Sequence, residues 1–359
     1  MVTDSKKTED SQQAKKYSRA KNLPSAVKII STGRYLPPKI LTNADLTKIV
    51  DTSDEWITTR TGIKERRIAG DDVSTSDLGV EAAKIALKKS GLTIKDIDLI
   101  ICATITPDKF FPSTACYIHK KLCASLLCGE ETVEIPAFDI SAACSGFIYA
   151  LSVAGGMIRS GLSRRALVVG AETLSKFTDW QDRSTCVLFG DGAGAMIIEA
   201  SDNPEENSFA SFYISADGQY SELLHLPAGG SAMPASESTV KDRLHFMKMA
   251  GKEVFKVAVT KMSEAFEKAV ASSPFSFEDV SLFIPHQANM RIIDAVARRL
   301  NFPMEKTYVN VHKYGNISAA TTIVALDEAI EEGRVKKGDV VSLVAFGGGF
   351  TWGAAILKL

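Results

Sequence analysis

The stretch Gly91-Leu-Thr-Ile-Lys-Asp-Ile-Asp-Leu-Ile-Ile101 recurs further along the chain as Pro274-Phe-Ser-Phe-Glu-Asp-Val-Ser-Leu-Phe-Ile284. An Ala/Lys-rich amphipathic pattern precedes each copy, so both predict a helix, a cap and then a buried strand. A second pair follows in the same order, because Val187–Ile198 resembles Val344–Ile356. In each of these segments, glycines between two apolar runs indicate a tight reversal or a close approach of the backbone.

This repeat predicts an α/β chain made of two similar halves, residues 27–199 and 200–359. A functional site is expected where the halves meet. Residues 1–26 are rich in Lys, Ser, Thr and Gln and carry almost no large apolar side chains, so we expect a disordered tail there. Asp4, Glu9 and Asp10 argue against a transit peptide, because such peptides contain few acidic residues.

The composition is that of an ordinary globular protein. The 359 residues include 42 basic and 43 acidic side chains, so the net charge of −1 gives no reason to expect bulk nucleic-acid binding. No apolar run approaches the roughly 18 residues that span a bilayer, and the start lacks the apolar core of a signal peptide. The six cysteines lie between residues 102 and 186 without C-x-x-C spacing. We therefore expect a reduced, cytoplasmic protein with no metal.

Cys144 is predicted to lie at a turn between a strand and a helix. The apolar strand pattern Ala137–Ile140 is followed by Ser141-Ala-Ala-Cys144-Ser-Gly146 and then by helical spacing of apolar residues over Phe147–Ile158. The N-terminal N–H groups of such a helix can lower a thiol pKa and hold an oxyanion. Cys144 is therefore a predicted nucleophile. The remaining cysteines are interpreted as small buried core residues, namely Cys102, Cys116, Cys123, Cys128 and Cys186.

Two candidate partners lie in the second half of the chain. His286 follows the predicted strand Leu282–Pro285, so it is expected at the carboxyl edge of a sheet, where α/β sites gather. Taken alone, a histidine in this position is more often a satisfied structural group than a catalytic one. Tyr308 begins a further predicted strand that leads into a turn at Gly315-Asn316 and a helix of small residues. Asn316 could equally be the N-cap of that helix.

With Cys144, His286 and Asn316 in this order, the chain from about residue 28 to its end resembles the β-ketoacyl-acyl carrier protein synthase III family of the thiolase-like superfamily. The motifs that carry the resemblance are Asp51-Thr-Ser-Asp-Glu-Trp56-Ile, Arg60-Thr-Gly-Ile63, Asp139-Ile-Ser-Ala-Ala-Cys144-Ser-Gly-Phe, Phe189-Gly-Asp-Gly-Ala-Gly194, Pro285-His286-Gln-Ala-Asn289, Gly315-Asn316-Ile-Ser and Phe346-Gly-Gly-Gly-Phe-Thr-Trp-Gly353. The resemblance implies an α/β, thiolase-like fold with five layers, αβαβα, built from two similar halves.

The resemblance also implies a reaction, the decarboxylating Claisen condensation of an acyl-CoA starter such as acetyl-CoA with malonyl-acyl carrier protein, which initiates fatty acid biosynthesis. Cys144 would be acylated, and the N–H groups of Cys144 and Gly348 would bind the thioester oxyanion. His286 and Asn316 would donate hydrogen bonds to the malonyl thioester oxygen and stabilise the enolate formed as carbon dioxide leaves. No metal or other cofactor is implied.

Substrate and partner contacts follow from the same resemblance. Trp56 and Arg183 would sandwich the adenine of CoA, with Thr52, Arg60 and Asn289 along the nucleotide and pantetheine path. Phe346 would line the acyl pocket, Lys256 and Arg291 would meet the acyl carrier protein, and Phe111 would reach across a homodimer into the partner's acyl pocket. The neighbouring Phe110 is expected to stay in the core. Residues 122–136 and 201–242 are longer than the family segments, which leaves the preferred starter chain open.

Several alternatives stay open on sequence alone. A thiolase is disfavoured because no cysteine follows Cys186, and extended-chain synthases carry two histidines where this chain offers His286 and Asn316. A hydroxymethylglutaryl-CoA synthase or a stand-alone acyl-CoA condensing enzyme shares the Cys-His-Asn set and is the runner-up. From other classes, Gly190–Gly194 could cradle phosphates as in actin-like proteins, although no Walker lysine follows. A metal-binding module could use Cys116, His119, Cys123 and Cys128, although their spacing is irregular.

Overall fold

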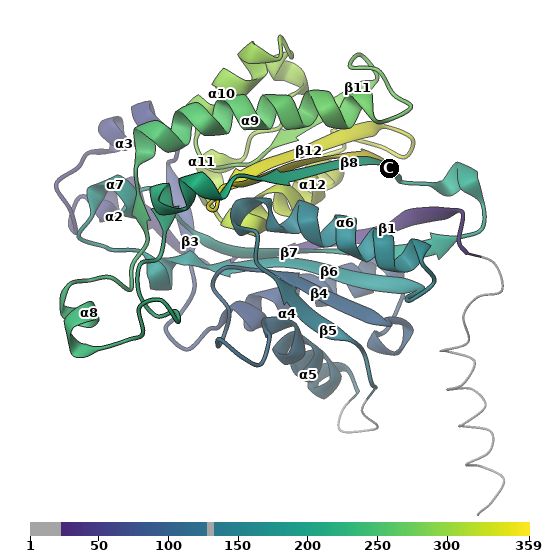
Figure 1. The fold of residues 1–359 in the computed structure, drawn as a ribbon, viewed down its shortest axis with the longest axis horizontal. Helices are drawn as coiled ribbons and strands as arrows, with labels where there is room; N and C mark the ends of the chain where they lie inside the picture. The colour runs from purple at the N-terminus through teal and green to yellow at the C-terminus, as the bar shows by residue number, and fades with distance from the viewer. Residues whose placement is uncertain (1–22, 128–132) are drawn as a thin grey trace, which may run out of the picture.

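Residues 23–127 and 133–359 are described by the computed structural model, and within them the strands form two main sheets (Figure 1). The first sheet has the order β1 (Ala26–Tyr35), β7 (Asp191–Ser201), β6 (Arg165–Thr173), β4 (Leu99–Ala103) and β5 (Ala137–Ile140). The second has the order β11 (Val280–Pro285), β12 (Val340–Gly347), β13 (Thr351–Lys358) and β8 (Phe209–Ala216). Two small hairpins pair β2 (Lys39–Thr42) with β3 (Glu65–Ile68) and β9 (Leu224–His225) with β10 (Lys248–Met249).

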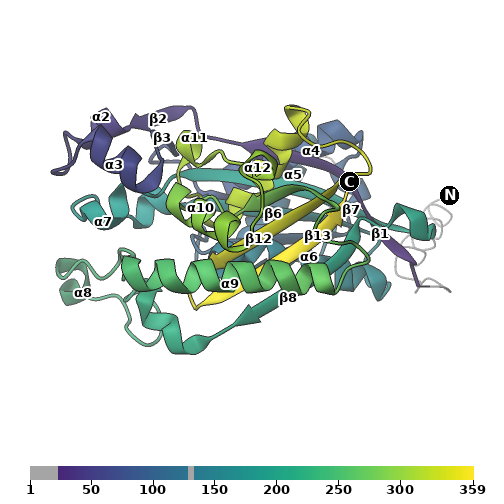
Figure 2. The same cartoon turned by 90° about the horizontal axis from the view of Figure 1, so that it is seen from above.

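The longer helices form three layers around these sheets, as Figures 1 and 2 show from two sides. The outer face of the first sheet is covered by α4 (Thr75–Ser90) and α5 (Thr114–Leu126). Between the sheets lie α6 (Gly146–Arg159) and α12 (Thr321–Glu331), and α9 (Gly251–Ala271) and α10 (Met290–Arg299) cover the second sheet. The predicted five-layered αβαβα architecture is therefore confirmed.

Short helices complete the chain around the ends of the strands. They are α2 (Asn43–Leu46), α3 (Asp54–Thr61), α7 (Arg183–Cys186), α8 (Glu237–Lys241) and α11 (Val311–Tyr314). In both views α3, α7 and α8 lie at the same end of the molecule, opposite the C-terminus. None of the helices in the described ranges is long and apolar enough to cross a membrane.

The repeated stretch folds as its pattern predicts. In the first copy α4 ends at Gly91, whose φ of 70° is in the left-handed region that favours glycine, and a short turn leads into β4. β4 is buried along its whole length between two parallel neighbours, which explains its unbroken apolar sequence. In the second copy α9 leads through a similar turn into β11, which also pairs in parallel with its neighbour.

The structure corrects two details of the predicted organisation. The glycines of Val344–Ile356 do join two strands directly, but in the first half β6 and β7 are separated by residues 174–190, so Phe189-Gly190 is not a hairpin turn. The segment at Tyr308 forms only an isolated parallel bridge to the edge strand β11, Phe283 to Thr307, and not a strand.

Each main sheet takes its strands from one continuous part of the chain, residues 26–201 for the first sheet and 209–358 for the second. We keep the division into halves at 27–199 and 200–359 as a proposal about the folding units. The expected tail, residues 1–26, falls mostly outside the described residues, and so do Cys128 and the middle of the 122–136 segment.

Candidate active site

Cys144 lies in the single turn η2 (Ala143–Ser145), which joins β5 to the buried helix α6. The turn sits between the two sheets because its residues are small: a Cβ on Gly146 would already lie 3.2 Å from Ala103 Cβ and 3.5 Å from Ala319 Cβ. Ala143 has a φ of 45°, an uncommon and strained value for a residue other than glycine. The predicted strand-to-helix turn is thus present, and it places the Cys144 sulfur at the start of α6.

The glycine turn between β12 and β13 presses against the backbone of Cys144. A Cβ on Gly347 would lie 2.4 Å from Cys144 N and 2.9 Å from Ala143 Cβ, so no side chain fits at this position. Gly348 is similarly restricted, since its Cβ would lie 2.8 Å from Leu224 O. This turn brings the main chain of Gly348 to the same pocket as the Cys144 thiol.

His286 immediately follows β11, and its N–H donates to Val344 O at 2.7 Å, which fixes the backbone to the neighbouring strand. The imidazole is only 4% exposed, and its Nδ1 lies 2.6 Å from Thr321 Oγ1. Burial lowers the pKa of His286 to about 3, so the ring is neutral near pH 7. With Nδ1 occupied by Thr321, the remaining ring nitrogen, Nε2, is free for a ligand in the pocket.

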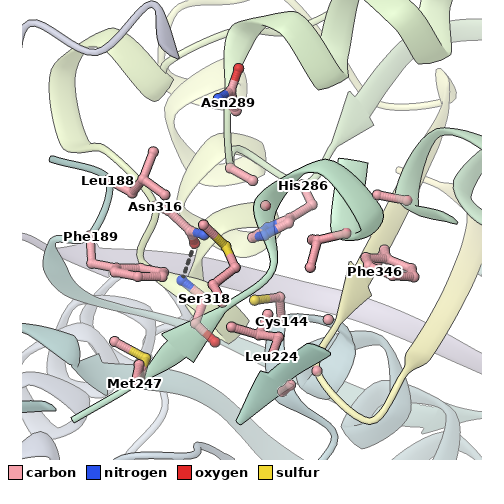
Figure 3. Close-up of a pocket in the computed structure, with 18 of the residues that line it drawn as sticks. Cys144, Leu188, Phe189, Leu224, Met247, His286, Asn289, Asn316, Ser318 and Phe346 are labelled. Carbon is pink, nitrogen blue, oxygen red and sulfur yellow. Dashed lines mark hydrogen bonds between the residues drawn. The ribbon is translucent and has the colours of Figure 1, made fainter. Parts of the chain in front are cut away.

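Asn316 lies in the turn before the short segment η7 (Ser318–Ala320), and Figure 3 shows it close to His286 and Cys144. Its Oδ1 accepts the Ser318 N–H at 2.8 Å, which leaves the Nδ2 donor of the amide without a partner among the described residues. The N-cap interpretation is partly right, because the side chain does satisfy a backbone N–H at the start of a helical turn. The same bond fixes the orientation of the amide.

These groups share one cavity of about 1180 Å³, whose walls are mostly apolar. Its lining includes Cys144, His286, Asn316 and Gly348 together with Leu188, Phe189, Leu224, Met247 and Phe346, several of which are labelled in Figure 3. Residues of both halves therefore line one cavity, as the repeat predicted. Such a cavity suits an apolar chain that ends in a polar, reactive group.

Comparison with known proteins identifies the family. Residues 138–218 and 270–359 match the two parts described as 3-oxoacyl-[acyl-carrier-protein (ACP)] synthase III and its C-terminal region. The chain is 53% identical over 335 residues to the beta-ketoacyl-[acyl-carrier-protein] synthase III of Natranaerobius thermophilus, covering 93% of this chain and 99% of that one. The chain belongs to this family.

Other members of the synthase III family agree with that assignment. The Aquifex aeolicus protein of the same name is 51% identical over 331 residues, covering 92% of this chain and 99% of that one. The crystal structure of 3-oxoacyl-[acyl-carrier-protein] synthase III from Aquifex aeolicus VF5 superposes with a TM-score of 0.83 at 50% identity, covering 93% of this chain and all of that one. The resemblance drawn from the motifs is thereby confirmed.

The residues assigned to CoA lie at the mouth of the synthase III cavity. Trp56, on α3, is half-buried, with the guanidinium of Arg60 4.5 Å from its ring centroid and that of Arg183 4.8 Å away on α7. Trp56, Arg60 and Asn289 line the cavity, whereas Thr52 and Arg183 do not. Two cations therefore contact the Trp56 ring.

The basic residues assigned to the carrier protein also reach the rim. Lys256 is exposed on α9, and Arg291 is exposed in the first turn of α10 with its guanidinium 6.0 Å from the Phe255 ring. Both line the mouth of the cavity. Asn289 caps α10 by accepting the Arg291 N–H at 2.8 Å, so this turn holds the rim in place.

Phe111 is not part of the cavity in its own chain. Its side chain is 84% exposed, and that of Phe110 is 83% exposed. The expectation that Phe110 stays in the core is therefore wrong, because the segment between β4 and α5 runs over the surface. Two adjacent exposed phenylalanines are unusual on the surface of a monomer.

The expected activation of the Cys144 thiol is also corrected. Burial raises the pKa of Cys144 to about 12. The desolvation of a charged sulfur outweighs the effect of the helix terminus. The resting residue is therefore a neutral thiol. Among the other cysteines, Cys116 is exposed and not in the core, whereas Cys102, Cys123 and Cys186 are buried as predicted.

The sequence analysis missed three polar groups around this site, Thr321, Ser318 and Glu172. Thr321 contacts His286, and Ser318 was quoted in a motif without a role. Glu172 stands at the end of the buried strand β6, where its burial raises its pKa to about 7. The sequence did contain a signal for Glu172, namely a carboxylate at the end of an apolar strand pattern, because such a residue is seldom buried without a reason.

The two rival site types find no support in the described residues. Gly190, Gly192 and Gly194 pack directly against protein atoms, with Cβ positions only 2.5 to 2.8 Å from their nearest neighbours, so they form no phosphate cradle. His119 contacts Val133 O and Cys123 Sγ, and no group of three potential metal ligands occurs within the described ranges. The 201–242 extension does border the cavity through Leu224, whereas no described part of 122–136 does.

Proposed function

We propose that this synthase III catalyses the condensation of an acyl-CoA starter with malonyl-acyl carrier protein, the first carbon–carbon bond-forming step of fatty acid synthesis. The chain is an acyltransferase of the β-ketoacyl-ACP synthase III family. The observation that carries the proposal is the convergence of a cysteine at a helix start, a neutral histidine and a free amide donor in one apolar cavity. Mass spectrometry after incubation with a mixture of acyl-CoA thioesters tests it by identifying the acylated residue and the preferred chain.

The geometry supports a division of roles between the two half-reactions. In acyl transfer the Cys144 and Gly348 N–H groups would hold the thioester oxygen. In decarboxylation Nε2 of His286 and Nδ2 of Asn316 would donate to the malonyl thioester oxygen. The Thr321 hydroxyl donates to Ser318 O at 3.0 Å, and it would have to turn towards Nδ1 of His286, 2.6 Å away, to leave the ring proton on Nε2.

The runner-up is a hydroxymethylglutaryl-CoA synthase or a stand-alone acyl-CoA condensing enzyme, which would use the same three side chains. Assays with malonyl-acyl carrier protein, malonyl-CoA and acetoacetyl-CoA separate these reactions. The exposed cations Lys256 and Arg291 at the rim favour an acidic carrier protein, because opposite charge steers association. We also propose a homodimer, on the exposure of Phe111, and a cytoplasmic location.

Arg183 must move for an adenine to lie between it and Trp56. The guanidinium now stacks on the indole at 4.8 Å, and inserting a ring requires about 3.5 Å more. The Arg183 side chain is about half exposed, and its hydrogen bond and ion pair within the described residues are both with Asp51, so such a movement is inexpensive. The stacked pair is therefore a pre-formed site for a planar base.

Trp56→Ala is expected to raise KM for acetyl-CoA about fivefold while kcat changes little, because one stacking contact on a ligand is worth roughly 1 kcal/mol. Steady-state kinetics measure the split. Acetyl-pantetheine, which has no adenine, is the matched substrate and should show no change in KM. An equal rise for both substrates would mean that Trp56 shapes the channel and does not bind the base.

Phe111→Ala is expected to shift the preference towards longer or branched starters without stopping acetyl transfer. If the ring closes the partner's acyl pocket, each added methylene that the variant accepts is worth about 1 to 3 kcal/mol, or 10- to 200-fold in relative kcat/KM. A chain-length series of acyl-CoA substrates measures this. Phe110→Ala is the matched control, since that ring is equally exposed. An unchanged profile in both variants would show that the pocket closes within one subunit.

A further inference from the structure

A single hydroxyl, that of Thr351, joins the glycine turn to the Cys144 turn, residues 142–145. Thr351 is the first residue of β13, and its half-buried side chain lines the cavity. Its Oγ1 lies 2.8 Å from Ala142 O and 2.7 Å from Ser145 Oγ. Because Ala142 precedes Cys144 and Ser145 follows it, the hydroxyl contacts the Cys144 turn on both sides of the reactive residue.

The donors and acceptors around this hydroxyl follow from their number. Ala142 O has two lone pairs and three donors within reach, which are Ser145 N at 3.2 Å, Ser145 Oγ at 2.7 Å and Thr351 Oγ1 at 2.8 Å. Each donor has a lone pair of its own, at the shorter distances, when Ser145 donates to Thr351 and Thr351 donates to Ala142 O. Gly348 O, 3.3 Å from the Thr351 hydroxyl, then receives only a weak contact, because the hydroxyl has one proton.

Thr351 is itself held on several sides. Its backbone pairs with Gly347 across the hairpin and with Ala216 on β8. Its methyl group lies against the glycine turn, since a Cβ on Gly349 would be 3.2 Å from Thr351 Cγ2. Among the described residues, every hydrogen bond between the glycine turn with its Thr351 and the Cys144 turn involves this hydroxyl. The position of one turn is therefore transmitted to the other through one fixed side chain.

Packing and hydrogen bonding limit the gap between the two turns in opposite directions. A Cβ on Gly347 would meet Cys144 N at 2.4 Å, so the two backbones lie in direct contact and cannot come closer. Contact of this kind does not stop the turns from separating. The bonds of Thr351 do, because an O–H···O hydrogen bond needs a separation of about 2.5 to 3.0 Å.

On the condition that the function proposed above holds, we propose that Thr351 is a positioning residue for acyl transfer, whose hydroxyl fixes the separation of the Cys144 and Gly348 N–H groups. Two donors stabilise an oxyanion only when both reach it at about 2.7 to 3.1 Å, so a change in their separation weakens at least one of them. Thr351 itself exchanges no proton with the substrate. His286 and Asn316 act in decarboxylation from other elements, so that half-reaction does not depend on Thr351.

Thr351→Val removes the hydroxyl and keeps the shape of the side chain. The Ser145 hydroxyl can then donate to Ala142 O, 2.7 Å away, so no buried polar group is left unpaired and the fold should be retained. We expect acylation of Cys144 by acetyl-CoA to slow about 10- to 100-fold, less than the loss of a whole oxyanion donor. Single-turnover mass spectrometry measures this rate, and Thr351→Ser, which keeps the hydroxyl, should restore most of it.

The second half-reaction and a remote threonine provide the controls. Thr351→Val enzyme that has been acylated in advance should release carbon dioxide from a malonyl thioester at the wild-type rate. Thr307→Val is the matched control, because the same substitution removes a hydroxyl that donates to Pro303 O at 3.1 Å and does not line the cavity. This variant should acylate normally.

The carbonyl group of the acetyl-enzyme reports on the two donors directly. Hydrogen bonds to a carbonyl oxygen weaken the C=O bond and lower its stretching frequency. With an isotope label on the acetyl carbonyl carbon, the infrared band of the Cys144 thioester should lie at a higher frequency in Thr351→Val than in the wild type, and it should return in Thr351→Ser. A general loss of stability would not move this band while the enzyme stays folded.

Failure of the proposed function and failure of the role of Thr351 give different results. If the wild-type enzyme forms no acyl-enzyme at Cys144, the proposed function fails. If it does, but Thr351→Val acylates at the wild-type rate with an unchanged band, or Thr351→Ser restores nothing, the positioning role is refuted. Equal losses of acylation and decarboxylation would also refute it, because they indicate a merely structural effect. Should Thr351→Val not fold, Thr351→Ala carries the same predictions.

Discussion

Cys144→Ala is expected to form no acyl-enzyme and to lose condensation activity by a factor on the order of 10⁶, as when the nucleophile of a hydrolase is removed. Cys144 is the only one of the five described cysteines that lines the cavity. Peptide mapping after incubation with acetyl-CoA measures the acylated position.

Two other thiols serve as controls for this experiment. Cys116 is exposed on α5 and would be labelled by non-specific chemistry, whereas Cys102 is buried in β4 and should stay unlabelled. Cys116→Ala should condense at the wild-type rate. Acyl label that persists in Cys144→Ala, or condensation that survives in it, would contradict the assignment of the nucleophile.

His286→Ala and Asn316→Ala are each expected to slow malonyl decarboxylation about 10²- to 10³-fold and to leave the acylation of Cys144 largely intact. Each removes a donor that meets the oxygen on which the enolate charge collects. Release of carbon dioxide from a malonyl thioester, measured on enzyme acylated in advance, reports the second half-reaction alone. Because the pKa of His286 is about 3, its neutral donor persists and this rate should not titrate through His286 between about pH 5 and pH 9.

Asn316→Asp removes the amide donor while it keeps a side chain of the same shape. A carboxylate can still accept the Ser318 N–H as the amide oxygen does, so the turn should keep its geometry. It offers an acceptor where the amide offers Nδ2, and we expect a loss at least as large as in Asn316→Ala. Equal damage to acylation and decarboxylation would refute the division of roles between the half-reactions.

Much of the fold could be predicted because its signals are local. The repeat at residues 91–101 and 274–284 consists of an amphipathic helix, a cap and an apolar strand, and each is encoded within a few neighbouring residues. The turn that carries Cys144 could be predicted for the same reason, since small residues separate a strand pattern from a helix pattern. The motifs around His286 and Asn316 placed both side chains in the same site through the family resemblance.

Other features were decided only by tertiary contacts. Cys144 is a neutral thiol because two sheets and a glycine turn enclose it, and this desolvation outweighs the helix terminus that the sequence shows. Phe110 and Phe111 are identical residues in one short loop, and the path of that loop over the surface leaves both exposed.

By itself the sequence determined the order of helices and strands, the two-fold repeat and the residue types at the site, because periodicity and turn chemistry act over a few residues. The tertiary structure alone decided which groups meet across the halves. Glu172 and Ser318 are far apart in the chain, and they share the surroundings of Cys144 only because η7 packs against β6. Protonation states at this site follow from burial and from such neighbours, which no local pattern encodes.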